Sequence, residues 1–172
     1  MRLPVLALPL HSVEDTLQAL REVGRALGGE ARAEALISDF QATRARIRAQ
    51  SKSLTPPRVL FVYGFEPLVV AGPGSFADEL LRDAGGRNVA QDAKSPYPVY
   101  SLEHAVAARP DVVVDASDTA MGRDKVRTLP GLEDARWVQV PSKALLQPGP
   151  SLGKGLEELF GLLHPAPRPP AR

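Results

Sequence analysis

Arg58-Val-Leu-Phe-Val-Tyr63 opens the part of the chain that decides its fold, because this β-branched and aromatic run predicts a strand. The glycine-rich segment Gly64–Gly74 follows as a loop, and Ser75 and Ser101 then begin two amphipathic helices as N-caps. The run Asp111-Val-Val-Val-Asp-Ala116 is apolar on both faces, as strands of parallel sheets are. A strand, two helices and a strand with short connections predict an α/β fold with a mostly parallel sheet.

The residues before this unit predict one strand and two helices. The apolar run Leu3–Leu8 predicts a buried strand, and Ser12 is expected to cap a helix that ends at Gly28. A second helix is predicted from Glu30 to Lys52, longer than the usual dozen or so residues, which indicates a strut. The inward positions are expected to be Val13, Leu17, Leu20 and Leu27 in the first helix, and Leu36, Ile37, Phe40 and Ile47 in the second.

The stripe formed by Arg44, Arg48 and Lys52 on this long helix is interpreted as a solvated face.

The residues after the central unit complete the α/β pattern. A short helix is predicted at Gly122–Thr128, a strand at Arg136–Val140 and a loop at Pro141–Pro150. Ser151 is expected to cap the last helix, and the proline-rich tail His164–Arg172 is predicted to be disordered. The apolar face of this last helix is Leu152, Leu156, Leu159, Phe160 and Leu163.

Composition excludes several classes of protein. The chain is 44% hydrophobic and 24% charged, which is typical of a globular protein. Its net charge of +1 does not indicate a surface that binds nucleic acid. It has no cysteine, which excludes disulfides, thiolate catalysis and cysteine-based metal sites. No apolar run approaches the roughly 18 residues of a membrane span. We expect no signal peptide in Met1–Leu10, because it holds two prolines and lacks a small-residue cleavage site.

The loops at the carboxyl ends of parallel strands carry ligand sites in α/β folds. Here these loops are Gly64–Gly74, Ser117–Met121 and Pro141–Pro150. Tyr63 and Phe65 lie at the first of these loops and Tyr97 lies in the loop before the second helix, which predicts that a ligand would meet this edge.

Motifs for catalysis or metal binding are weak. Gly72-Pro-Gly-Ser75 precedes a helix, but it lacks the lysine of a phosphate loop, so a turn with a cap is favoured. His11, His104 and His164 are far apart in sequence and have no partner at helical spacing. The structural alternative for Tyr97 is a loop aromatic that packs on the domain surface. The structural alternative for Glu103 is a charge that stabilises the start of a helix.

Five motifs together resemble a known family. They are Arg58-Val-Leu-Phe-Val-Tyr-Gly64, Gly72-Pro-Gly-Ser-Phe-Ala-Asp-Glu-Leu-Leu81, Ala84-Gly-Gly-Arg-Asn88, Tyr100-Ser-Leu-Glu103 and Arg109-Pro-Asp-Val-Val-Val114. With Gln147-Pro-Gly-Pro150 before a leucine-rich helix, the chain resembles the carboxyl-terminal lobe of the substrate-binding proteins of ABC importers for cobalamin, haem and iron–siderophores.

The resemblance implies a division of the chain. It implies a remnant of an amino-terminal lobe at 1–29, a linking helix at 30–55, a Rossmann-like three-layer α/β lobe at 56–163 and a tail at 164–172. In that family the ligand lies between two lobes, so half a cleft should bind it weakly.

The resemblance also implies roles for individual residues. Tyr97 falls where the cobalamin binder stacks an aromatic ring on its ligand, and Glu103 falls on the acidic residue that docks the permease. Lys143 and Gln147 fall on polar positions of the last cleft loop. Many relatives have arginine at the position of Gln147 and again at Ser151, so recognition of anionic groups is in doubt here.

The remaining expected ligand contacts are Tyr63, Phe65, Ser117 and Asp118.

The resemblance implies a periplasmic binding protein without catalysis. Its ligand would be a metal chelate with its metal already coordinated, a corrinoid first and a ferric siderophore or haem next. We expect no directly bound cofactor, an ABC importer permease as partner, and a homodimer through the apolar segment Leu3–Leu27. A nucleotide-binding or enzymatic domain on the same α/β layers stays open, as does an interaction domain with no small ligand.

Overall fold

The computed structural model describes residues 5–166, and a mixed five-stranded sheet lies at its centre. The strands are β1 (Arg58–Phe65), β2 (Leu68–Val70), β3 (Arg87–Asn88), β4 (Val112–Asp115) and β5 (Arg136–Gln139). The order β2-β1-β4-β5 holds four of them, and β3 pairs with the amino-terminal end of β1. All pairings are parallel except that of β1 with β2, so the predicted mostly parallel sheet is confirmed.

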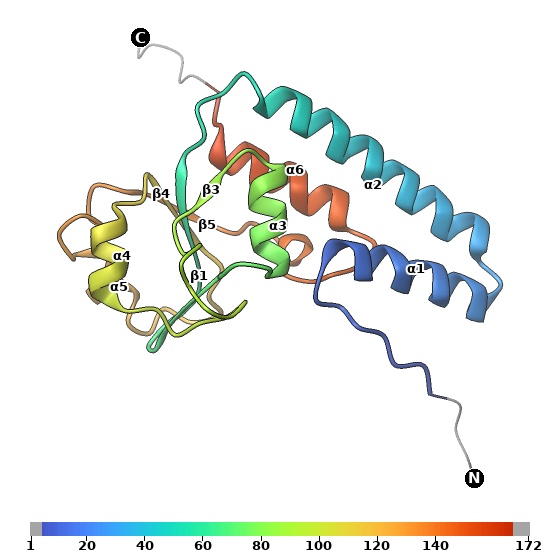
Figure 1. Cartoon of the computed structure of the whole chain (residues 1–172), viewed down its shortest axis with the longest axis horizontal. Coiled ribbons are helices and arrows are strands. Elements are labelled where there is room, and N and C mark those ends of the chain that lie inside the picture. Colours follow the sequence, from blue (N-terminus) through green and yellow to red (C-terminus); the bar gives the residue numbers. More distant parts are fainter. Residues whose placement is uncertain (1–4, 167–172) are drawn as a thin grey trace.

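Helices cover both faces of this sheet. They are α1 (Val13–Leu27), α2 (Glu30–Ser51), α3 (Phe76–Asp83), α4 (Leu102–Ala108), α5 (Arg123–Arg127) and α6 (Leu152–Leu163), with a 3₁₀ turn η1 (Lys143–Leu145) before α6. Helices α3 and α6 lie on one face, and α4 and α5 lie on the other (Figure 1). This is the three-layer α/β lobe expected from the sequence.

Alternating side chains of the strands supply two separate cores. Phe61 and Val114 face the core under α3 and α6, whereas Leu60 and Val113 face the core under α4 and α5. All four residues of β4 are therefore buried, which confirms the interpretation of its sequence as a strand covered on both faces.

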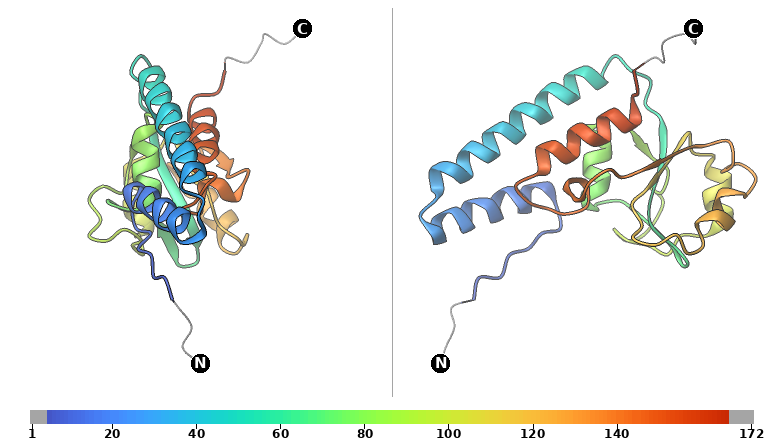
Figure 2. Two further views of the ribbon diagram at one scale, coloured as in Figure 1. Left: turned by 90° about the vertical axis from the view of Figure 1, so that its right-hand side faces the viewer. Right: turned by 180° about the vertical axis from the view of Figure 1, so that it is seen from behind.

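Helix α2 is unbroken over 22 residues and packs outside α6 and α3. Ile37, Phe40 and Ile47 are buried, while Leu36 is only half-buried. Figures 1 and 2 show α2 running past the sheet with α1 antiparallel beside it. The single long helix is confirmed, and its role as a link between lobes stays a prediction. No helix within residues 5–166 has the length and apolar character needed to cross a bilayer.

The stripe on α2 is not simply a solvated face. Arg44 Nε and Arg48 Nε lie 2.6 Å from the two carboxylate oxygens of Asp83, which is 2% exposed at the end of α3. Lys52 is exposed, as expected. The two arginines thus dock α2 onto the lobe, because a carboxylate buried at this position requires cationic partners.

Helix α1 begins as predicted but is not buried along its whole length. Ser12 and Asp15 form the expected capping box, and Val13 N donates to Glu79 Oε2 on α3 over 3.2 Å. Val13 and Leu17 are buried and Leu20 is half-buried, whereas Leu27 is 80% exposed, so its inward assignment is wrong. Leu27 is the last residue of α1, directly before the C-cap Gly28.

Two predictions about strands are wrong. Residues 5–8 form no strand, because no other described segment pairs with them, and Val5 is 87% exposed. Residues 3 and 4 lie outside the described part. The segment Gly64–Gly74 is not only a loop, since β1 continues to Phe65 and β2 returns antiparallel to it. Gly64 and Pro67 interrupt the alternation of apolar and polar residues that would otherwise indicate this hairpin in the sequence.

Two predictions about the last helix also need correction. Ser151 occupies the N-cap position of α6, but its side chain makes no capping hydrogen bond. His164 is ordered, because its Nε2 lies 2.9 Å from Ala84 O and its ring lies 5.0 Å from that of Phe160. Residues 167–172 of the predicted tail lie outside the described part.

Candidate ligand-binding site

The carboxyl ends of β1, β4 and β5 meet at one edge of the sheet. In the parallel register Val62 lies opposite Asp115, and Asp115 lies opposite Gln139. The segments that follow these strands therefore start side by side, as the sequence predicts. This edge carries most of the residues expected to contact a ligand.

An aromatic pair stands at the end of β1. The rings of Tyr63 and Tyr97 lie 5.5 Å apart at an interplanar angle of 62°, an edge-to-face contact. Tyr63 in turn contacts the buried Phe61 at 5.2 Å, so the aromatic contacts run from the core to the surface. Tyr97 is 52% exposed, which leaves much of its ring free for a ligand.

The loop that carries Tyr97 is held by backbone hydrogen bonds on both sides of it. Gly72 N donates to Pro96 O over 2.9 Å, and Val70 N donates to Pro98 O over 3.2 Å. A Cβ atom at Gly72 would lie 2.1 Å from Ser95 O, so only glycine permits this close approach. The Gly72-Pro-Gly-Ser75 turn thus positions Tyr97, and Ser75 Oγ accepts from Asp78 N as the expected N-cap.

Burial raises the pKa of Tyr63 far above its ordinary value of 10.0, and the neighbouring Tyr97 raises it further. The Tyr63 phenol is therefore neutral at physiological pH and is a hydrogen-bond donor rather than an anionic ligand.

Phe65 does not share the exposed position of Tyr97. It is 5% exposed, and its ring stacks on Trp137 at 5.8 Å in the second core. Its expected contact with a ligand stays a prediction, and its present contacts are those of a core residue.

Ser117, Asp118 and Lys143 line one pocket of about 210 Å³ between the ends of β4 and β5. Asp118 is exposed, whereas the Ser117 hydroxyl donates to Asp115 Oδ1 over 2.6 Å. The pocket combines a carboxylate, hydroxyls and an ammonium group, so it offers both donors and acceptors to a polar ligand.

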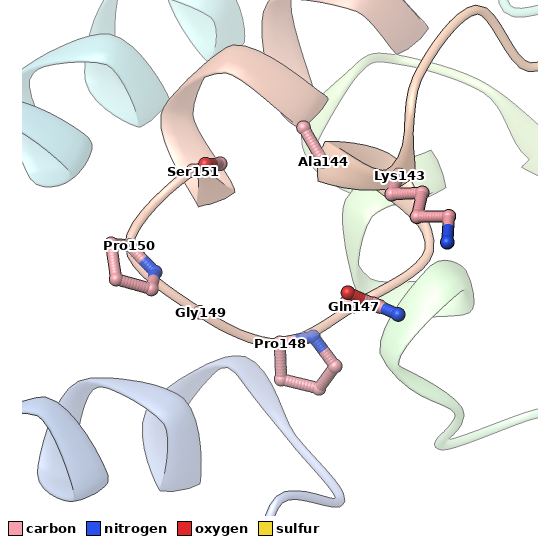
Figure 3. A pocket seen from close by; sticks show the side chains of 7 residues that line it. All are labelled: Lys143, Ala144, Gln147, Pro148, Gly149, Pro150 and Ser151. Atoms are coloured by element: carbon pink, nitrogen blue, oxygen red, sulfur yellow. The ribbon is translucent and has the colours of Figure 1, made fainter.

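Lys143 and Gln147 line a second pocket of about 190 Å³ in the loop before α6. Figure 3 shows both side chains on one side of the loop, away from Pro150. Because Ser117 and Asp118 line the first pocket together with Lys143, the structure brings together the loops after β4 and β5 as the sequence predicts.

One ion pair at this edge was missed in the sequence. Asp115, 5% exposed at the end of β4, lies with its Oδ2 2.6 Å from Arg123 Nε. Arg123 Nη2 also donates to Ser117 Oγ over 3.3 Å, so the pair holds the start of the loop. The sequence signal for this ion pair was an aspartate at the end of an otherwise apolar, buried strand, because a buried carboxylate needs a cationic partner.

Glu103 lies apart from these pockets at the start of α4. Its carboxylate is exposed and accepts from Ser101 Oγ over 2.6 Å. This hydrogen bond is the main cause that holds the pKa of Glu103 below its ordinary value. Ser101 Oγ also accepts from His104 N, so its role as an N-cap is confirmed.

Across residues 5–166, no three His, Cys, Asp or Glu side chains gather in a way that suits a metal ion.

The comparisons with known proteins agree with this architecture. The family model described as periplasmic binding protein matches residues 2–139. A vitamin B12-binding protein of Salmonella choleraesuis (strain SC-B67) is 28% identical over 111 residues, which cover 64% of this chain and 40% of that protein.

Two solved structures are similar along most of the chain. A periplasmic haem-binding protein from Pseudomonas aeruginosa has a TM-score of 0.80 at 29% identity and covers 98% of this chain and 66% of its own. A periplasmic haem-binding protein from Roseiflexus sp. RS-1 in apo form has a TM-score of 0.74 at 33% identity and covers 88% of this chain and 63% of its own. The chain spans less than half of the Salmonella protein and about two thirds of each solved structure. With its fold and a family match over most of its length, the chain belongs to the periplasmic binding protein family.

Proposed function

We propose that this chain acts as the carboxyl-terminal lobe of the solute-binding component of an ABC importer for a metal chelate. The observation that carries the proposal is the edge-to-face pair Tyr63–Tyr97 beside polar pockets at the carboxyl edge of the sheet. An exposed ring suits a flat macrocycle, and the polar pockets suit its side groups. The ligand brings its metal already coordinated, and the lobe performs no catalysis.

A corrinoid is the favoured ligand, and a ferric siderophore or haem comes next. Lys143 and Gln147 line the pocket before α6, and Gln147 stands where the resemblance implies arginine in many relatives. An amide such as that of Gln147 donates and accepts hydrogen bonds, which matches neutral carboxamide groups better than propionates or catecholates. The pairing of Arg123 with buried Asp115 adds no uncompensated positive charge.

The proposal also covers the rest of the system. The chain works in the periplasm, and Glu103 pairs with a basic residue of the permease as a charge-assisted hydrogen bond. Residues 1–29 belong to an amino-terminal lobe, 30–55 link the lobes and 56–163 form the lobe that carries Tyr97. A second lobe completes the cleft, because one lobe leaves most of the ligand in water.

Two substitutions test the assignment. Tyr97→Ala is expected to weaken cyanocobalamin binding about five- to tenfold, since the stacking contact contributes roughly 1 kcal/mol or more. Glu103→Ala is expected to leave that affinity unchanged and to reduce transport through the importer. Isothermal titration with cyanocobalamin and with haem, and uptake measurements, give the two readouts; Leu54→Ala, exposed and remote, is the control.

Unchanged cyanocobalamin binding in Tyr97→Ala would show that the cleft assignment is wrong. Tighter binding of haem than of cyanocobalamin would reject the corrinoid while leaving the role of Tyr97 intact.

A further inference from the structure

A polar cavity of about 410 Å³ lies between α2 and α3. Its lining residues, which together form the arginine cavity, are Arg44, Arg48, Glu79, Arg82 and Asp83. Arg44 and Arg48 lie one turn apart on α2, and the other three residues share one face of α3 because of their helical spacing. The arginine cavity shares no lining residue with the pockets around Lys143, so it is separate from the candidate ligand site.

Buried carboxylates hold all three arginines of this cavity. Asp83 is 2% exposed and accepts from Arg44 Nε and from Arg48 Nε over 2.6 Å each. Asp78 is 1% exposed and accepts from Arg82 Nη2 over 3.2 Å. A guanidinium group has five N–H donors, so each arginine keeps donors that these carboxylates do not use. Because the guanidinium groups are already held in place, a ligand that accepts from them meets a lower entropic cost of binding.

The lining of the arginine cavity carries a net positive charge. Its three arginines face two carboxylates, and both carboxylates already accept hydrogen bonds. Glu79 Oε2 accepts from Val13 N, over 3.2 Å, at the start of α1, where the partial positive charge of the helix terminus adds to the compensation. The unused guanidinium donors therefore belong to a surface that attracts an anion.

We propose that the arginine cavity binds a phosphate-type oxyanion, either a free phosphate or the phosphate group of a lipid. The planar donor fork of a guanidinium group matches the oxygens of phosphate, and the hydrogen bonds between them are charge-assisted. The bound anion bridges α2 and α3, so it strengthens the attachment of the long helix to the lobe. The inference goes beyond the proposed importer function and does not depend on it.

A metal ion is a poorer occupant of the arginine cavity. The three guanidinium groups would repel it, and the oxygens of Glu79 and Asp83 already accept from N–H groups. The cavity also fails the ligand count, because no set of three carboxylate or histidine side chains in the described part of the chain suits a metal.

The test measures phosphate binding to the whole chain by isothermal titration calorimetry and by melting temperature, with chloride in place of phosphate at equal ionic strength. We expect saturable binding and a melting temperature that rises with phosphate concentration, because the anion binds the folded state. Arg48→Gln with Arg82→Gln should weaken this binding at least about tenfold, since two charged donor groups are lost. Both side chains are more than half exposed and Arg44 still pairs with Asp83, so folding should be retained.

Two further variants separate anion binding from stability. The matched control, Arg21→Gln with Arg46→Gln, removes the same charge from arginines that pair with the exposed Glu34 and Glu157, and it should bind phosphate as the unmodified chain does. Glu79→Gln removes one negative charge from the lining and should tighten phosphate binding about threefold. A loss of stability does not produce tighter binding, so this variant tests the charge argument directly.

Lipid vesicles distinguish the two sources of the phosphate group. Binding to phosphatidylglycerol vesicles that free phosphate displaces, and that the double variant loses, would identify a lipid headgroup, with phosphatidylcholine vesicles as the control. Phosphate binding without vesicle binding would identify a free phosphate.

Three results would overturn the anion site. They are phosphate binding that does not saturate, equal phosphate affinities for the double variant and the matched control, and weaker phosphate binding by Glu79→Gln.

Discussion

Gly72 shows how one residue without a side chain sets the geometry of the candidate site. Because its Cβ position would lie 2.1 Å from Ser95 O, Gly72→Ala must push the Tyr97 loop away from β2. We expect a loss of about 1–3 kcal/mol in the free energy of unfolding and weaker cyanocobalamin binding. Gly161→Ala is the control, because nothing lies within 4 Å of its Cβ position in α6, and it should stabilise the chain by up to about 1 kcal/mol. Equal effects in urea unfolding would contradict the close-approach argument.

Tyr100 gives a prediction about pH at the same scale. Burial, followed by the nearby Asp92 carboxylate, raises the pKa of Tyr100 from 10.0 to about 12. The folded state therefore prefers the neutral phenol, and this stabilisation is complete below pH 10 and is lost as pH rises toward about 12. Between about pH 9 and about pH 11, the melting temperature of Tyr100→Phe should fall less than that of the unmodified chain. Parallel curves would show that Tyr100 is not the group responsible.

At the scale of elements, the attachment of α2 to the lobe depends on one buried carboxylate. Asp83 accepts from both Arg44 and Arg48, whereas Arg46 on the same helix pairs with Glu157 in an exposed position. We expect Asp83→Asn to cost about 1.5–3 kcal/mol, because two charged hydrogen bonds lose their anionic acceptor. Arg46→Ala should cost less than about 1 kcal/mol, since exposed ion pairs contribute little. Chemical denaturation of both variants checks this, and equal losses would argue against Asp83 as the anchor.

At the scale of the whole molecule, an exposed apolar surface lies near the start of the chain. Its exposed residues are Val5, Leu6, Leu10, Val23 and Leu27. Leu10 and Val23 also line a pocket of about 210 Å³ between α1 and the loop Pro148–Pro150. Apolar surface of this kind is usually buried by association.

We predict a homodimer through α1, which light scattering after size-exclusion chromatography measures. Val23→Asp with Leu27→Asp should give a monomer with an unchanged melting temperature, because both side chains are exposed in the isolated chain. Met121→Asp, on a different surface, should remain dimeric. A monomer for the unmodified chain at high concentration would contradict the prediction.

Hydrophobic periodicity and capping residues allowed most elements to be predicted. The apolar run of β4 and the caps Ser12, Ser75 and Ser101 are local signals, since they depend on residues within a few positions of each other. The candidate site could be placed at the carboxyl edge for the same reason, because a parallel sheet brings the ends of β1, β4 and β5 together wherever it forms.

Only the tertiary structure decided which side chains are free and which are occupied. Phe65 and Tyr97 are both aromatic residues near the end of β1, yet packing buries Phe65 and leaves Tyr97 half-exposed. Arg44 and Arg123 look like ordinary surface cations in the sequence, but Asp83 on α3 pairs with Arg44 and Asp115 at the end of β4 pairs with Arg123. The sequence by itself thus determined most of the elements and their order, because these follow from local periodicity. The tertiary structure decided burial, ion pairing and the absence of a strand at residues 5–8, because each depends on neighbours that are far away along the chain.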